Sequence, residues 1–249
     1  MESKLEFDIL PQPDEGTCGP TCLHSVYQYY GEQISLKSVI RTTPRLRSGG
    51  TLAVFLAGHA LRRGYRALMF TYNLQMFDPT WFPFRRHVLR RKLAEQARHR
   101  TGRRLHRATA GYVDFLDQGG ELRLEDLTAG LIRKYLRRGV PILTGLSATY
   151  LYRTAREFGP RADYDDIRGK ASGHFVVLCG YDRKERSVLV ADPLLPNPIF
   201  DTRQKYKVPI DRVVGAILLG ILTYDANLLI IEPRSGAKKG TRHADSHRR

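Results

Sequence analysis

Cysteine is scarce in this sequence, with three among 249 residues. Three cysteines cannot build a disulfide framework, and an odd number favours free thiols in a reducing compartment. The first ten residues, MESKLEFDIL, also lack the cationic start and the apolar run that mark a signal peptide. We therefore expect a cytoplasmic location.

Long hydrophobic runs are missing as well. The longest, residues 213–222, has about half of the roughly 20 residues that a membrane helix needs, so we expect no integral membrane association. With 42% hydrophobic and 27% charged residues, the composition excludes a mostly disordered or fibrous chain. We predict one domain over residues 1–233, with a basic insertion at about 78–120 and a disordered basic tail at 234–249.

Acidic residues are outnumbered, because 41 Lys and Arg face 25 Asp and Glu and leave a formal charge of +16. Residues 85–107 hold ten basic residues and one acidic residue, which leaves little to neutralise them internally. A charge run is often only a solvated helix face, but this excess favours an anionic partner at residues 85–107. The run has no Phe, Tyr or Trp to stack on bases, which makes nucleic acid an unlikely partner without excluding it.

The pattern of apolar residues places helices early and strands late, which is typical of an α+β protein. We predict helices at residues 18–30, 52–63 and 124–138, and strands at residues 65–72 and 140–146. Residues 174–181 and 187–191 flank the polar turn 182–186 and predict an antiparallel hairpin. Residues 210–224 are expected to form a helix and then a strand, followed by a last strand at 228–231.

Candidate chemistry begins at Cys18, which the pattern places at the start of the first helix. Unpaired backbone NH groups and the positive end of the helix dipole favour a thiolate there, and the thiolate is the nucleophilic form. Gly19 is expected to leave room for a substrate backbone. Gln12 precedes Cys18 by six residues, so its amide and the Cys18 NH can together bind a tetrahedral oxyanion.

A nucleophilic thiol needs an imidazole base, and the imidazole needs an orienting acceptor. His174 opens the first strand of the predicted hairpin and Asp192 follows the second. Pairing the two directly centres the hairpin on Arg183, within the polar turn, so we expect the carboxylate to lie beside the imidazole. We interpret the other two cysteines, Cys22 and Cys179, as core residues.

Four features of the sequence resemble a known family of enzymes. They are the Gln12–Cys18 spacing and the runs Cys-Gly-Pro-Thr-Cys-Leu at residues 18–23, Gly-His-Phe-Val-Val-Leu at 173–178 and Val-Ala-Asp-Pro at 190–193. They resemble the papain-like cysteine peptidases, and among these the bacteriocin-processing (double-glycine leader) peptidase family and its stand-alone members. The resemblance implies an α+β papain-like fold in which an N-terminal helical part packs on a C-terminal antiparallel sheet. It also implies an oxyanion glutamine, a nucleophile, a base and an orienting acid, which fall on Gln12, Cys18, His174 and Asp192.

We therefore expect a thiol-dependent hydrolase, a cysteine peptidase or amidase that cleaves a peptide amide through an acyl-enzyme on Cys18, with no metal or organic cofactor. Its partner would be a peptide or protein substrate. Two alternatives stay open. An amide transferase would use the same thiol and pass the acyl group to an amine, whereas a binding module would keep the fold and bind a peptide or an anionic partner without turnover.

Overall fold

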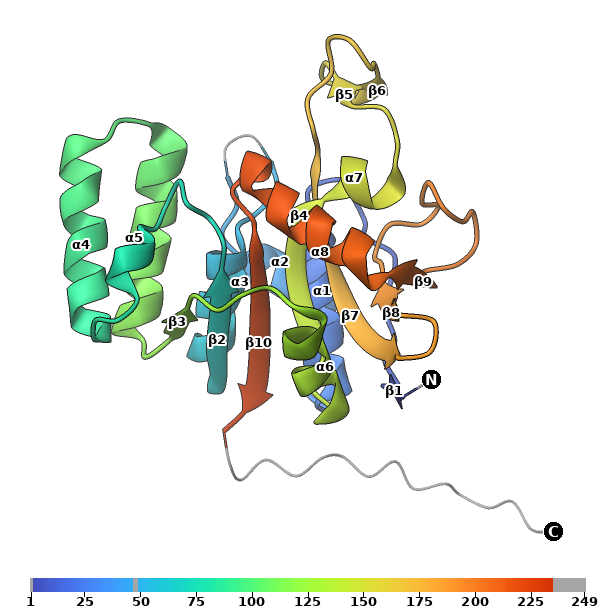
Figure 1. Cartoon of the computed structure of the whole chain (residues 1–249), viewed down its shortest axis with the longest axis horizontal. Coiled ribbons are helices and arrows are strands. Elements are labelled where there is room, and N and C mark those ends of the chain that lie inside the picture. The colour runs from blue at the N-terminus through green and yellow to red at the C-terminus, as the bar shows by residue number, and fades with distance from the viewer. Residues whose placement is uncertain (1, 47–48, 235–249) are drawn as a thin grey trace.

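A computed structural model describes residues 2–46 and 49–234 of the chain. Its centre is an eight-stranded sheet in the order β3-β2-β10-β4-β7-β8-β9, with β1 added beside β7 (Figure 1). The pairs between neighbours are antiparallel except that of β2 with β3, which is parallel. The strands of this sheet are β1 (Ser3–Lys4), β2 (Tyr65–Thr71), β3 (Glu121–Arg123), β4 (Ile142–Ser147), β7 (Gly173–Asp182), β8 (Ser187–Ala191), β9 (Lys205–Pro209) and β10 (Asn227–Pro233).

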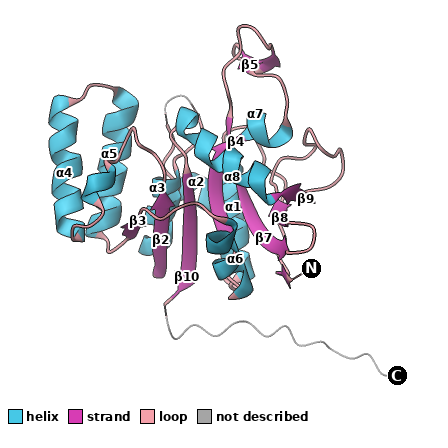
Figure 2. Cartoon of the chain, viewed as in Figure 1, coloured by secondary structure: helices cyan, strands magenta, loops and turns pink. Residues whose placement is uncertain are grey.

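Helices cover both faces of the sheet (Figure 2). The helices are α1 (Cys18–Tyr29), α2 (Leu36–Thr42), α3 (Ala53–Arg62), α4 (Arg86–His99), α5 (Arg103–Asp117), α6 (Ala129–Arg137), α7 (Ala148–Tyr152) and α8 (Ile210–Leu219), with 3-10 turns η1 (Pro79–Trp81) and η2 (Gly220–Thr223). One hydrophobic core joins α1, α3 and the α4–α5 pair to the sheet. A second core joins α6 and α8 to the opposite face.

Strand β7 shows why the late part of the sequence is a nearly continuous apolar run. Phe175, Val177 and Cys179 point into the core with α1, while Val176 and Leu178 point into the core with α6 and α8. A strand covered on both faces needs apolar residues at every position. The α+β class expected from the sequence is confirmed.

Helix α1 begins at Cys18, as predicted, and is buried along almost its whole length. It ends at Tyr29, and Gly31 follows with φ of 83°, a backbone conformation that favours glycine. A Cβ added to Gly19 would lie 2.6 Å from Thr51 Cγ2 and 3.1 Å from Phe175 Cδ2. Glycine at this position therefore lets α1 approach the sheet. The space that we expected for a substrate backbone is filled by Thr51 and Phe175.

The predicted insertion at about 78–120 contains η1 and the helical hairpin α4–α5, which lies at the left of Figure 1 and packs through α5 on α3. Its apolar contacts are made by Leu89 and Leu93 of α4 and by Leu105 and Phe115 of α5. The hairpin thus shares the core of α1 and α3, while the charged side chains of α4 stay outside. Of the predicted tail, only Arg234 lies within the described residues.

Two expectations about elements were wrong, and several short strands were missed. Helix α6 begins after Thr128, whose hydroxyl accepts a hydrogen bond from the Leu131 NH, and residues 124–128, which we expected to be helical, are irregular. Residues 220–223 continue α8 as a 3-10 turn, so no strand lies between Leu219 and Asn227. The sequence analysis did not predict the short strands, which include β9 and the separate two-stranded ribbon of β5 (Glu157–Phe158) and β6 (Asp163–Tyr164). Within the described part of the chain, no helix has the length and apolarity needed to span a membrane.

Candidate active site

Cys18 occupies the first position of α1 and is 7% exposed. The residue before it, Thr17, does not cap the helix with its side chain. Its hydroxyl instead donates to the Asp14 carbonyl at 2.7 Å and accepts from the Asp14 NH at 3.1 Å. The first-turn NH groups of α1 therefore stay without a side-chain cap next to the sulfur, an arrangement that favours an anion.

His174 lies at the start of β7, opposite Leu146 of β4, and is 8% exposed. Its Nε2 is 2.8 Å from Asp192 Oδ1, and Cys18 interacts with the same imidazole and raises its pKa. With Nε2 engaged by Asp192, Nδ1 is the nitrogen left for Cys18. The structure thus places the imidazole between the sulfur and the carboxylate.

The electrostatics of this group favour a protonated imidazole. Burial alone would lower the pKa of His174, but the Asp192 charge and hydrogen bond, together with Cys18, raise it well above its ordinary value. Burial likewise would raise the pKa of Asp192, yet His174 and two tyrosine hydroxyls bring it below its ordinary value. Each member of the pair therefore favours the charged form of the other.

The hairpin brings His174 and Asp192 together by a register that differs from our prediction. Val177 pairs with Ala191, and after an irregularity at Cys179 the pairing continues to Asp182 with Ser187. If the pairing of Val177 with Ala191 is continued for three residues toward the start of β7, His174 lies opposite Leu194 rather than Asp192. Asp192 is thus a diagonal neighbour on the same face, two residues away, still within reach of a long side chain.

Asp192 is fully buried and accepts hydrogen bonds from four groups. Oδ1 accepts from His174 and from the Leu194 NH at 2.9 Å. Oδ2 accepts from the hydroxyl of Tyr152, at 2.7 Å, and from the hydroxyl of Tyr206. Four donors compensate the desolvation of the carboxylate and fix its orientation.

Tyr152 and Tyr206 were missed by the sequence analysis. Tyr152 ends α7 and Tyr206 lies in β9, so only tertiary structure brings them to Asp192. For Tyr206 a signal did exist, because the buried residues Tyr206 and Val208 alternate with exposed Lys205 and Lys207. That alternation predicts a strand with one buried face.

Gln12 lies beside the segment that follows Asp192. Its backbone NH donates to the Pro193 carbonyl at 2.8 Å, which joins the loop before α1 to the loop after β8. Its side-chain Nε2 donates to the Asp14 carbonyl at 3.1 Å, and its Oε1 is buried without a hydrogen-bond partner among the described residues. One of the two amide protons is used within the loop, and the other is left for a ligand.

The remaining cysteines lie in the core, as predicted. Cys22 is fully buried one turn after Cys18, and its Sγ donates to the Phe175 carbonyl at 3.3 Å. Cys179 is fully buried in β7, where its Sγ lies 3.6 Å from the Leu189 carbonyl. Burial raises the pKa of both thiols, that of Cys179 to about 12. Neither thiol has the setting of a nucleophile.

Residues 107–215 match the model of the Peptidase_C39 like family. This chain resembles the C39 cysteine peptidases. The matched segment contains His174 and Asp192, while Gln12 and Cys18 precede it. The fold is α+β, with a cysteine-bearing helix packed on a mostly antiparallel sheet that carries the histidine. No curated protein sequence matches the chain.

Three solved structures are similar at low sequence identity. The peptidase domain of Streptococcus ComA, a bi-functional ABC transporter involved in quorum sensing, has a TM-score of 0.42 and 14% identity, covering 92% of this chain and 100% of that one. A double glycine motif protease from an AMS/PCAT transporter, solved with the leader peptide, has a TM-score of 0.44 and 14% identity over 93% and 95%. A C39-like peptidase from Bacillus anthracis has a TM-score of 0.43 and 15% identity over 93% and 98%.

Proposed function

We propose that this protein is a thiol-dependent hydrolase, a cysteine peptidase or amidase whose nucleophile is Cys18. The observation that carries the proposal is the position of His174, which is hydrogen-bonded to Asp192 and interacts with Cys18. Nucleophile, base and orienting group in this order are the arrangement that acyl transfer through a covalent intermediate requires. The substrate is a peptide or protein amide.

In the first half of the reaction, the Cys18 sulfur attacks the carbonyl carbon of the amide while His174 holds the thiol proton. The carbonyl oxygen becomes an oxyanion, which accepts hydrogen bonds from the Cys18 backbone NH and the Gln12 side chain. The C–N bond then breaks as His174 gives its proton to the leaving amine nitrogen. This leaves an acyl-enzyme on Cys18 and a neutral imidazole.

In the second half, His174 takes a proton from water as the water oxygen attacks the thioester carbon. The tetrahedral intermediate collapses, the C–S bond breaks, and a carboxylic acid leaves while the imidazolium and thiolate are restored. Asp192 stabilises the imidazolium in each half-reaction and fixes the ring so that Nδ1 faces the sulfur. All three cysteines are free, in keeping with a cytoplasmic protein, which we include in the proposal.

The experiment is acyl-enzyme trapping with a peptide library, read by intact mass and by mapping the modified residue. We expect a mass increase on Cys18 in the wild-type protein, none there in C18A, and much slower acylation in H174A. The control variant C22S removes a thiol but keeps a donor for the Phe175 carbonyl, so it should acylate as the wild type does.

The products of the same experiment separate the proposal from its two alternatives. Release of a free carboxylic acid supports hydrolysis, whereas transfer of the acyl group to an added amine in preference to water indicates an amide transferase. Peptides that bind without acylating Cys18, together with an equal rate of thiol modification in H174A, would indicate a binding module and overturn the proposal.

A further inference from the structure

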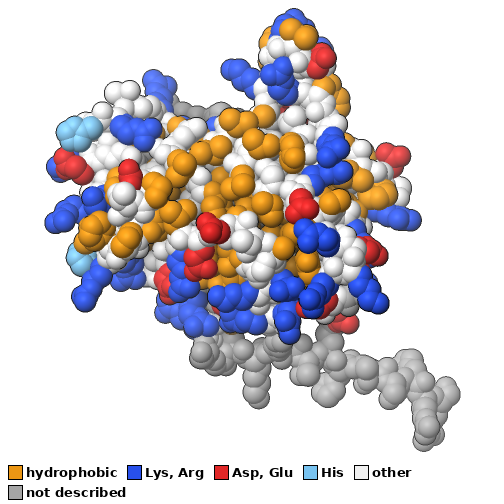
Figure 3. Space-filling view, in the orientation of Figure 1, with side chains coloured by type: hydrophobic (Ala, Val, Ile, Leu, Met, Phe, Trp, Pro, Cys, Tyr) orange, Lys and Arg blue, Asp and Glu red, His pale blue; other side chains and the backbone are white. Residues whose placement is uncertain are grey.

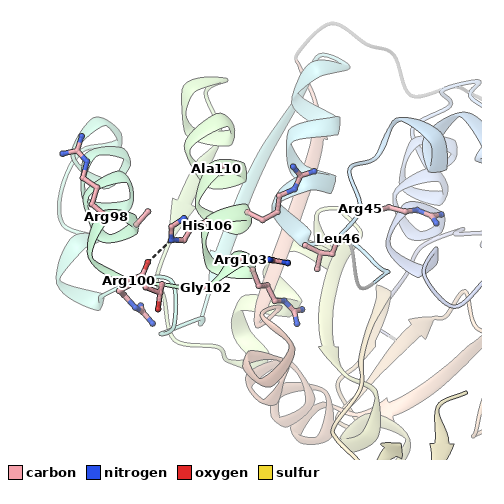
Figure 4. A pocket seen from close by; sticks show the side chains of 12 residues that line it. Arg45, Leu46, Arg98, Arg100, Gly102, Arg103, His106 and Ala110 are labelled. Carbon is pink, nitrogen blue, oxygen red and sulfur yellow. Dashed lines mark hydrogen bonds between the residues drawn. The ribbon is translucent and has the colours of Figure 1, made fainter. Parts of the chain in front are cut away.

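A groove of about 1100 Å³ lies between the α4–α5 hairpin and the segment around Arg45 and Leu46. Figure 4 shows Arg98, Arg100 and Arg103 on the hairpin side of the groove, with Arg45 and Leu46 across from them. Six arginines line it, and no Asp or Glu does: Arg45, Arg98, Arg100, Arg103, Arg104 and Arg107. The volume is at the upper end of what a small-molecule pocket has, so the groove can take a polymer segment.

The charge in the groove is only partly neutralised. Arg45 lies 3.8 Å from Asp14, and Arg98 lies 3.0 Å from Glu95. The other four arginines have no carboxylate within ion-pair distance among the residues that the structure describes. In Figure 3, Lys and Arg side chains also stand out over the hairpin side of the visible face. Three of these four have neutral partners, since Arg100 donates to the Gln75 carbonyl, Arg104 to the Thr223 carbonyl, and Arg107 lies over the Phe55 ring, but their charge is not neutralised. Such an excess of guanidinium groups without a carboxylate partner favours an anionic ligand.

The N-terminus of α5 adds to this preference. Gly102 precedes the helix with φ of 130° and offers no side chain to cap it, and the first two helical residues are Arg103 and Arg104. Positive side chains in the first turn oppose the helix dipole, whereas an anion there is stabilised. An anion bound at the start of α5 would offset the positive charges of its first turn.

The groove is connected through its lining residues to two parts of the candidate active site, the start of β7 before His174 and the loop that contains Gln12. On one side, Arg104 donates to the Thr223 carbonyl at 2.5 Å, and a Cβ added to Gly173, the residue before His174, would lie 2.5 Å from Thr223 Oγ1. On the other side, Arg45 pairs with Asp14, whose carbonyl accepts the Gln12 amide. A chain lying in the groove is therefore separated from the loop that holds Gln12 by Arg45, and from the start of β7 by Arg104 and Thr223.

We propose that this groove binds an acidic stretch of the polypeptide on which Cys18 acts, and so selects the substrate. The naming of the ligand as a substrate rests on the proposed function, whereas the binding of an acidic peptide does not. Polypeptide is favoured over nucleic acid because the groove has no Phe, Tyr or Trp among its lining residues to stack on bases. Leu46, Ala97 and Ala110 offer apolar contact to peptide side chains instead.

The test measures binding by fluorescence anisotropy with the full chain carrying C18A, so that turnover does not interfere. The probe is a fluorescein-labelled peptide of alternating Glu and Ala, compared with its Gln and Ala counterpart and with a labelled single-stranded oligothymidine of similar length. We expect the Glu peptide to bind more tightly than the other two, with an affinity that falls as salt is raised.

The decisive variant is R103E, with R85E as its matched control. Both residues are exposed, both stand next to a helix N-terminus, and both changes lower the net charge by two, but Arg85 lies at the far end of α4 from the groove. A glutamate at the start of α5 suits the helix dipole, so R103E should keep its thermal stability. We expect R103E to weaken binding of the Glu peptide about tenfold and R85E to leave it almost unchanged.

Equal losses in the two variants, or equal binding of the Glu and Gln peptides, would overturn the proposal. Tighter binding of oligothymidine, lost in R103E, would overturn it in favour of a nucleic-acid site. The outcome is separable from that of the proposed function. Peptide binding that depends on Arg103 without any acylation of Cys18 would overturn the hydrolase alone, whereas acylation that is indifferent to Arg103 and to acidic residues in the peptide would overturn only the groove.

Discussion

Nε2 of His174 lies 2.8 Å from Oδ1 of Asp192, although the two residues are diagonal rather than direct neighbours on the β7–β8 hairpin. The diagonal offset leaves the second carboxylate oxygen free to accept the hydroxyls of Tyr152 and Tyr206. One buried carboxylate therefore orients the imidazole while two tyrosines orient the carboxylate. This network, rather than Cys18 alone, decides in which pH range the imidazolium exists.

Replacing Asp192 by Asn should shift the pH profile of activity. The Asp192 charge raises the pKa of His174, so D192N lowers that pKa, and His174 loses its proton at a lower pH. We expect the alkaline limb of kcat/KM to move to lower pH and the value at neutral pH to fall roughly tenfold. A pH series on wild type and D192N checks this, with circular dichroism as the folding control. An unchanged alkaline limb would show that Asp192 does not control the proton on His174.

Tyr152 and Tyr206 should act as positioning residues. Their hydrogen bonds help to hold the pKa of Asp192 below its ordinary value, so Y152F and Y206F raise that pKa. The acid limb of kcat should then move to higher pH, while KM stays nearly constant because neither hydroxyl is expected to contact substrate. The double variant should show less than the sum of the two single effects, because both hydroxyls act on one oxygen. A change confined to KM would contradict this role.

How far the sequence predicts this protein depends on whether a feature is local. The start of α1 at Cys18 and the two strands of the hairpin follow from local patterns, and these were predicted correctly. The turn pairs Asp182 with Ser187 and so is not centred on Arg183, and the irregularity at Cys179 then shifts the register by one residue, which leaves the predicted pairing of His174 wrong by two residues. Since the side-chain period of a strand is two, that error kept both side chains on one face.

Features that depend on tertiary contacts could not be predicted in this way. Tyr152 reaches Asp192 across 40 positions of sequence, and Arg45 joins the α4–α5 groove from a loop that precedes it by more than 50 residues. The basic run predicted an anionic partner at residues 85–107, but not the groove. Arg45 belongs to that groove although it lies outside the run.

The role of Gln12 is tested by shortening its side chain. If its free amide proton binds the oxyanion, Q12A should lower kcat by about 10²- to 10³-fold and leave KM nearly unchanged. Alkylation of Cys18 by iodoacetamide forms no oxyanion, so its rate should be the same in Q12A and wild type. The backbone NH of residue 12 also donates to the Pro193 carbonyl, and the substitution keeps this hydrogen bond. Equal losses of kcat and of alkylation rate would indicate that Q12A only disturbs the loop.

The three thiols should differ in reactivity by their surroundings. Cys22 and Cys179 are fully buried in the core and have raised pKa values, whereas Cys18 sits at a helix N-terminus beside His174. We expect a neutral thiol reagent to modify one cysteine in the folded protein and three in denaturant, as counted by intact mass. In C18S the fast modification should disappear. Fast modification at two or three sites in the folded wild type would contradict the buried positions of the other thiols.

Asp225 should make the stability of the protein depend on pH. It is buried and accepts a hydrogen bond from the Ala53 NH at 3.1 Å, and burial raises its pKa to about 7 from its ordinary 3.8. An acid whose pKa is raised on folding stabilises the folded state at low pH, and this contribution is lost as the pH rises through the folded-state value.

The free energy of unfolding should therefore fall between about pH 4 and pH 7 because of this group, on the order of 1.4 kcal/mol for each pH unit. D225N keeps an acceptor for the Ala53 NH and removes the titration, so its unfolding free energy in urea should exceed that of wild type at pH 8 and depend less on pH. The exposed carboxylate of Asp201 provides the control, since D201N should follow the wild-type curve. A wild-type slope retained in D225N would place the titrating group elsewhere.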